Sequence, residues 1–141
     1  MAILTRTQII KAPVGEVFGT VVDGGNFAGW NPTIRSSRRL NEGEIGEGTR
    51  FEWDLRGFGK VVQELREFDR NKQVRIVPHI KMLSGGHRFR FTPQGDATRI
   101  DHELEMTPKG PFRLFAPIMG MIGRKNLRDT ANALQIHLEK R

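Results

Sequence analysis

Residues 87–106, HRFRFTPQGDATRIDHELEM, decide the fold. Apolar and charged side chains alternate on both sides of the segment PQGD, residues 93–96, which is typical of two antiparallel strands joined by a turn. The inward faces carry Phe89 and Phe91 on the first strand and Ile100, His102, Leu104 and Met106 on the second. The outward faces oppose bases to acids: Arg88 and Arg90 against Asp101, Glu103 and Glu105. Opposite charges stabilise an antiparallel pair, so both faces predict the same hairpin.

The two-residue period extends from this hairpin back to residue 33. Residues 51–55 and 60–69 each predict a strand, with a turn between them at 56–59. Alternation continues from Val74 to Met82, and Ser84-Gly85-Gly86 is expected to break the chain before the hairpin. Turn signals at such short intervals favour an antiparallel meander over parallel βαβ units.

Helical patterns flank this meander. Residues 3–10 predict a first strand, apolar spacings of three and four over 14–22 predict a short helix, and a second short helix is expected over 26–30. Residues 112–139 predict one long amphipathic helix, with Pro117 near its start or kinking its first turn. The fold class is therefore α+β, with the apolar face of the sheet buried against the long helix.

The composition excludes several classes of protein. A length of 141 residues, without linker or repeat, fits a single domain over residues 1–141. The absence of cysteine excludes disulfides, thiolate nucleophiles and cysteine-ligated metals. The apolar runs are too short to span a membrane, and residues 1–11 alternate in a way that does not resemble a signal peptide. We therefore expect a cytoplasmic protein without a transmembrane segment.

The formal net charge is +7. A nucleic-acid-binding protein concentrates its basic residues in one stripe, whereas here they form two clusters, 35–39 and 124–128, and many singletons. This distribution favours a solvated surface and predicts no specific nucleic-acid binding. Attraction to an anionic membrane, a nucleic acid or an acidic partner remains the alternative. We expect a monomer or a weak homodimer.

Four motifs occupy cap, turn and packing positions along the chain: IKAPVGEVF at 10–18, the stretch 23–32 ending in WNP, IGEGTR at 45–50 and EFD at 67–69. Together with the apolar terminal helix they make the whole chain resemble the START-like (SRPBCC) superfamily, in its polyketide cyclase/dehydrase and lipid-transport branch. The resemblance implies a helix-grip fold: a curved antiparallel sheet of six to seven strands wrapped around a long C-terminal helix, with two short helices after the first strand. It also implies an internal cavity for lipids, sterols, quinones or polyketides, but such a fold does not determine activity.

The expected cavity lies between the long helix and the inner face of the sheet. Its candidate ligand-binding residues are Trp30, Phe51, Trp53, Phe89, Phe91, His102, Leu104, Phe115, Ile118, Met119 and Ile122. Because a core must exist, many of these side chains pack in either case. The weak helical stretch 119–123, together with the glycines at 57, 59, 85 and 86, is the candidate gate for the ligand.

No catalytic motif stands out, and candidates for proton transfer are His102, Glu64 and Arg66. An inward His102 needs a polar partner, either a neighbouring strand or water in a structural role, or a ligand that it anchors or protonates. Glu64 and Arg66 form a buried pair, orient a ligand, or lie on the surface. The four histidines lack metal spacing, so we predict neither metal nor cofactor. The absence of tyrosine excludes a cyclase mechanism with a tyrosine acid.

The leading hypothesis is a binding or carrier protein for a hydrophobic small molecule. The first alternative is an enzyme of the polyketide cyclase, aromatase or dehydratase type that acts in the same cavity. The second is a regulatory or partner-binding module that uses the basic surface.

Overall fold

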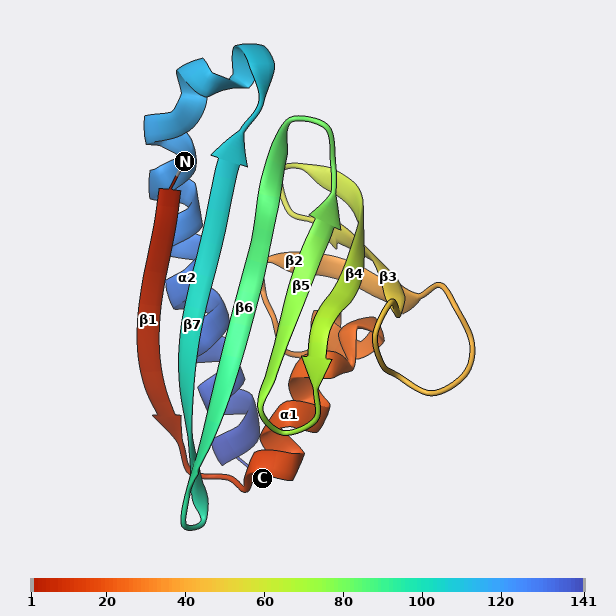
Figure 1. The fold of residues 1–141 in the computed structure, drawn as a ribbon, viewed down its shortest axis with the longest axis vertical. Coiled ribbons are helices and arrows are strands. Elements are labelled where there is room, and N and C mark those ends of the chain that lie inside the picture. Colours follow the sequence, from red (N-terminus) through yellow and green to blue (C-terminus); the bar gives the residue numbers. More distant parts are fainter. Residues whose placement is uncertain (1, 141) are drawn as a thin grey trace.

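Antiparallel pairing connects all seven strands of the computed structural model, which describes residues 2–140 (Figure 1). The strand order is β1-β7-β6-β5-β4-β3-β2, so the first strand pairs with the last. The elements are β1 (Ala2–Ile10), α1 (Val14–Val22), η1 (Gly24–Gly29), β2 (Ile34–Arg39), β3 (Arg50–Leu55), β4 (Gly59–Asp69), β5 (Gln73–His79), β6 (Leu83–Gln94), β7 (Ala97–Pro108), η2 (Gly110–Phe115) and α2 (Ala116–Glu139). The predicted helix-grip architecture is confirmed, with two short helical elements after β1.

The hairpin of β6 and β7 has the predicted register. Arg88 pairs with Glu103 and Arg90 with Asp101, and Nη1 of Arg88 donates to Glu103 at 2.7 Å. On the inner face, Phe89 and Ile100 are buried. The alternation of side chains therefore predicted both faces of this hairpin correctly.

The chain breaks before this hairpin at residues 80–82, and the prediction of a break at Ser84-Gly85-Gly86 is wrong. These three residues belong to β6, where Gly85 pairs with Met106 and Gly86 with Glu105. A Cβ at Gly85 would overlap the carbonyl oxygen of Glu105, and one at Gly86 would lie 2.7 Å from that of Ile76. The glycines allow strand backbones to approach closely here, so they extend β6 and place His87 inside a strand.

Replacing Gly85 with alanine should destabilise the protein by about 1–3 kcal/mol, because the new Cβ meets backbone that cannot move away. Gly85 also has φ of +127°, which L side chains rarely adopt. Urea denaturation of the variant measures the loss. Gly46→Ala is the matched control, since nothing lies within 4 Å of a Cβ added at that position. Equal stability of the two variants would contradict the close approach at Gly85.

Strict alternation fails once within β4, at Glu67. This residue has φ of +51°, and the register with β5 shifts between Arg66 and Asp69, as in a β-bulge. As a result Leu65 and Phe68 both face the core, where the ring centroids of Phe68 and Phe18 lie 5.4 Å apart. Glu67 turns outward to Arg75 and Arg88.

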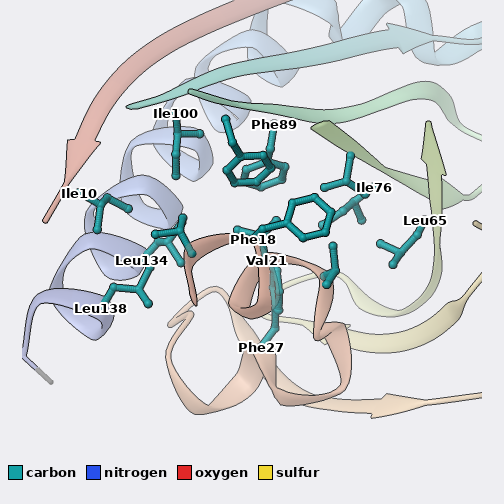
Figure 2. Close-up of a cluster of buried hydrophobic side chains, with 14 of the residues drawn as sticks. Ile10, Phe18, Val21, Phe27, Leu65, Ile76, Phe89, Ile100, Leu134 and Leu138 are labelled. Carbon is teal, nitrogen blue, oxygen red and sulfur yellow. The ribbon is translucent and has the colours of Figure 1, made fainter. Parts of the chain in front are cut away.

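The core lies where α1, η1 and the last turns of α2 meet the inner face of the sheet (Figure 2). Phe18 and Phe27 enter from α1 and η1, Leu134 and Leu138 from α2, and Phe89 and Ile100 from the sheet. Helix α2 packs mainly against β1 and β7. The central strands of the sheet lie outside this contact, so α2 alone does not cover the inner face of the sheet.

The terminal helical segment is divided in two. Residues 110–115 form the 3-10 helix η2, and the α-helix begins at Ala116, four residues later than predicted. Pro117 lies in the first turn of α2, where its missing N–H costs no hydrogen bond.

Candidate functional site

A cavity of about 350 Å³ opens between the inner face of the sheet and the first half of α2. This volume lies at the lower end of the range for sites that hold small organic molecules. Apolar side chains dominate its wall: Trp53, Val61, Ile76, Phe89 and Leu104 from the sheet, Phe27 from η1, and Met119 and Ile122 from α2. The wall is therefore suited to an apolar molecule.

Three polar side chains in this wall, those of Asn31, Thr33 and Thr130, already have partners. Asn31 donates from its amide nitrogen to the hydroxyl of Thr130 at 3.2 Å and accepts two hydrogen bonds from Thr33. Gln63 differs, because its side chain is without a hydrogen-bond partner among residues 2–140 although the residue is only 5% exposed. Its amide atoms face the open cavity and are not buried, since within residues 2–140 the one buried side-chain polar atom without a partner is Nε of Arg39. Gln63 is therefore available to a polar group inside the cavity.

A second polar group in the wall is His87, which ends a chain of buried hydrogen bonds. Its Nε2 lies 2.9 Å from Nδ1 of His102, and Nε2 of His102 lies 2.6 Å from Oε1 of Gln8. The amide nitrogen of Gln8 donates to the carbonyl oxygen of Ala131 in α2 at 3.0 Å. We call this the His87–His102–Gln8 chain; it connects the cavity through β6, β7 and β1 to the helix.

Both imidazoles in the chain are neutral near pH 7. Burial holds the pKa of His87 well below its usual value, and the neighbouring His102 lowers it further. Burial also lowers the pKa of His102 to about 4, with a smaller contribution from Arg6 that Asp101 partly opposes. A neutral imidazole carries one N–H and one bare nitrogen.

The fixed end of the chain determines which nitrogens carry protons. The carbonyl of Ala131 only accepts, so Gln8 presents its amide oxygen to His102, whose Nε2 must then donate. Neutral His102 therefore has a bare Nδ1, which accepts a hydrogen bond from Nε2–H of His87. The remaining nitrogen of His87, Nδ1, is a bare acceptor without a partner among the described residues. The chain thus gives the cavity an oriented hydrogen-bond acceptor.

The predicted ligand-binding residues fall into three groups. Five of them line the cavity: Trp53, Phe89, Leu104, Met119 and Ile122. Four lie outside its wall in or beside the packed core: Phe51 against Gly24, Phe91 against Phe18, Trp30 against Phe27, and His102 behind His87. Phe115 and Ile118 are exposed, contrary to the expectation that they face the sheet. The buried side of α2 runs through Met119, Gly123 and Leu127, so Ile118 lies off it, and Phe115 belongs to η2.

His102 is buried with an inward side chain, as alternation predicted, and has protein partners on both ring nitrogens. It does not line the cavity, so it can influence a ligand only through His87. His87 was not predicted to line the cavity, because the expected break at residues 84–86 placed it beside a loop. Gln63 was not predicted to line the cavity either. It alternates with the apolar residues Val61 and Leu65, and this pattern indicated an inward position.

Glu64 and Arg66 lie on the outer face of β4, away from the cavity. The buried carboxylate of Glu64 contacts Arg66 at 2.7 Å, His79 at 2.9 Å and Arg50 at 3.1 Å. Burial raises the pKa of Glu64, but the hydrogen bond from His79 and the charges of Arg66 and Arg50 outweigh it and lower the pKa overall. This position contradicts both residues as catalytic groups in the cavity and makes them an outer ion-pair cluster.

The candidate gate is only partly in the wall. Met119, Gly123 and Gly86 line the cavity, as does Phe58, which lies between Gly57 and Gly59 in the β3–β4 turn. Gly85, Gly120 and Met121 do not contribute to the wall. A gate at this position stays a prediction.

Two searches of the described residues bear on other kinds of site. Within residues 2–140 there is no group of three or more histidine, aspartate or glutamate side chains arranged to hold a metal ion. None of the helices in that range combines the length and apolar character needed to cross a membrane.

Comparison with known proteins agrees with this fold. A family model described as polyketide cyclase / dehydrase and lipid transport matches residues 1–139. No curated protein sequence matches the chain. A START superfamily protein from Mycobacterium smegmatis superposes with a TM-score of 0.80 at 20% identity, covering 98% of this chain and 97% of that one. The Zhui aromatase/cyclase from a Streptomyces species gives 0.77 at 14% identity, covering 99% and 94%. At these identities the two structures show a shared fold.

Proposed function

The chain belongs to the polyketide cyclase/dehydrase and lipid-transport family, and from that premise we propose that it binds a mostly apolar small molecule in its cavity, anchored by a hydroxyl group. The hydroxyl donates to the bare Nδ1 of His87, and the amide of Gln63 is available to a second polar atom of the ligand.

The observation that carries this proposal is that two polar groups of a mostly apolar wall, Nδ1 of His87 and the amide of Gln63, have no partner among residues 2–140. In the open cavity both groups are accessible to water. A ligand that displaces this water without replacing its hydrogen bonds would leave them unsatisfied, at a cost of about 1–3 kcal/mol each. A ligand that pairs with His87 and Gln63 avoids that cost. A dry structural core would have no use for either group.

The same two groups restrict the chemistry of the ligand. A phenol, sterol-like alcohol or enol can donate to Nδ1 of His87. A carboxylate would place its negative charge against a lone pair and beside neutral imidazoles, so ionised fatty acids fit poorly. A quinone has only acceptors and could pair with Gln63 but not with His87.

A matched pair of probes tests the hydroxyl anchor. β-Naphthol should bind about tenfold more tightly than its methyl ether by calorimetry, which corresponds to about 1.4 kcal/mol. His87→Phe should remove this difference, because ring volume is broadly retained while the acceptor is lost. His79→Phe is the control, since His79 lies on the outer face with Glu64. If the wild type bound the two probes equally, the hydroxyl anchor would be contradicted. If it bound neither probe, the cavity would not be a binding site for them.

One observation favours a second candidate, an enzyme in the same cavity. A neutral imidazole with a bare nitrogen can accept a proton from a bound substrate, and a positioned base of this kind contributes about 10²- to 10⁴-fold to a rate. His87 would be that base. If turnover is found with a polyketide-like substrate, His87→Phe should reduce kcat by such a factor and leave KM nearly unchanged. An unaffected kcat would eliminate His87 as the base.

A further inference from the structure

We propose that η2 and the first two turns of α2 form a docking surface for an anionic lipid bilayer. This surface comprises residues 109–125 and projects beyond the sheet at the end where β7 finishes, in light blue at the top of Figure 1. It does not depend on which ligand occupies the cavity.

The first observation is a concentration of exposed apolar side chains. Within nine residues, five large apolar side chains are between 50% and 85% exposed: Leu114, Phe115, Ile118, Met121 and Ile122. Scattered apolar residues on a surface are ordinary, whereas a contiguous group marks an interaction site. Phe115, Ile118 and Ile122 were expected to face the sheet, but the buried side of α2 runs through Met119, Gly123 and Leu127 instead.

The second observation is the charge around this group. Residues 106–128 contain five bases, Lys109, Arg113, Arg124, Lys125 and Arg128, and no aspartate or glutamate. Lys125 and Arg128 lie 3.7 and 3.5 Å from Asp129. Lys109, Arg113 and Arg124 form no ion pair within residues 2–140. Basic residues beside exposed Leu, Phe and Ile side chains are the combination that binds the interface of anionic membranes.

Other partners fit this combination less well. A symmetric dimer through the apolar group would bring the bases of two copies together without acids to neutralise them. A nucleic acid would satisfy the bases but leave Leu114 and Met121 exposed to water. An anionic bilayer satisfies both, since its head groups pair with the bases and its acyl boundary receives the apolar side chains.

The docking surface adjoins the cavity. Met119, Ile122 and Gly123 line the cavity wall from the same turns of α2 that carry the exposed group. A bilayer held at this surface would therefore meet the helix side of the cavity, so an apolar ligand could pass between lipid and protein with little exposure to water.

Vesicle co-sedimentation tests the surface directly, with the full chain and no ligand. The wild type should bind vesicles of phosphatidylcholine mixed with phosphatidylserine at least tenfold better than phosphatidylcholine alone, and added salt should weaken the binding. Leu114→Ser/Met121→Ser should reduce binding through the apolar contribution. Arg113→Gln/Arg124→Gln removes two bases and should reduce binding by about 25-fold, about fivefold for each base near a charged membrane, and flatten its salt dependence.

The matched control is Ile9→Ser/Arg35→Gln, which removes one exposed apolar side chain and one base from β1 and β2. It should bind vesicles like the wild type. Circular dichroism should show all variants folded, since every substituted side chain is exposed. Equal binding by control and surface variants, or no preference for phosphatidylserine, would overturn the proposal. Self-association of the wild type that Leu114→Ser/Met121→Ser abolishes, without vesicle binding, would instead assign the surface to a second copy of the chain.

Discussion

Replacing Phe18 with alanine should lower the free energy of unfolding by about 3–5 kcal/mol. Phe18 is 1% exposed and makes edge-to-face ring contacts with Phe68 at 5.4 Å and with Phe91 at 5.2 Å. Its removal deletes a large buried apolar side chain and leaves a void that α1 and the sheet can close only partly. Urea denaturation with a constant m-value measures the loss.

Phe58→Ala is the control for this substitution. It removes the same ring from a position that is 53% exposed, so the free energy of unfolding should change by about 0.5 kcal/mol or less. A similar loss in both variants would show that the core between α1 and the sheet is not packed as described.

His102→Phe should cost about 2–4 kcal/mol, although histidine and phenylalanine have similar volumes. The substitution leaves the amide oxygen of Gln8 and Nε2–H of His87 buried without partners, and each such group costs about 1–3 kcal/mol. The double variant His87→Phe/His102→Phe removes one of these two groups. It should therefore lose less stability than the sum of the two single variants. An additive loss would contradict the hydrogen bond between the histidines.

The His87–His102–Gln8 chain also predicts the direction in which the stability of the protein changes with pH. The pKa of His102 is about 4 in the folded protein and near 6.5 unfolded, so below pH 6.5 the unfolded chain binds more protons. Stability should therefore fall as the pH decreases from about 6.5 toward 4. The carboxylates Glu64 and Glu67, whose pKa values are lowered, contribute only below about pH 4.5, their ordinary value. The double variant His87→Phe/His102→Phe should lose the upper part of this slope; an unchanged slope would show that neither histidine is responsible.

The fold was predictable where local patterns and global packing agree. The alternation in residues 87–106 predicted the register of β6 and β7, and the spacing in 14–22 predicted α1. The family resemblance supplied the helix-grip arrangement. Glu67 was not predictable, because a positive φ at a residue other than glycine has no signal in the alternation of side chains. Gly85 and Gly86 were misinterpreted for the opposite reason, since glycine serves turns and close strand contacts equally well.

The candidate site was predicted at the level of its apolar wall. Trp53, Phe89 and Leu104 follow from strand alternation. The polar groups were harder to predict, because which histidine reaches the cavity depends on three strands together. Gln8 of β1 binds His102 of β7, and His102 in turn binds His87 of β6. His87 is therefore the histidine that is left to face the ligand. The exposure of Ile118 depends on which side of α2 meets the sheet, and that of Phe115 on where η2 ends. A helical period alone specifies neither.

The pairing of β1 with β7 has a consequence for biosynthesis. Ala2 pairs with Met106 and Ile10 with Thr98, so partners lie 88 to 104 residues apart along the chain. During translation the first strand leaves the ribosome early and has no partner until almost the whole chain has been made. The hairpins from β3 to β7 connect neighbours in sequence and can form sooner, since short loops close at lower entropic cost. We therefore expect the N-terminal strand, with Ile3 and Ile9 exposed on it, to be added last, and to be the segment most in need of protection from aggregation while the chain is incomplete.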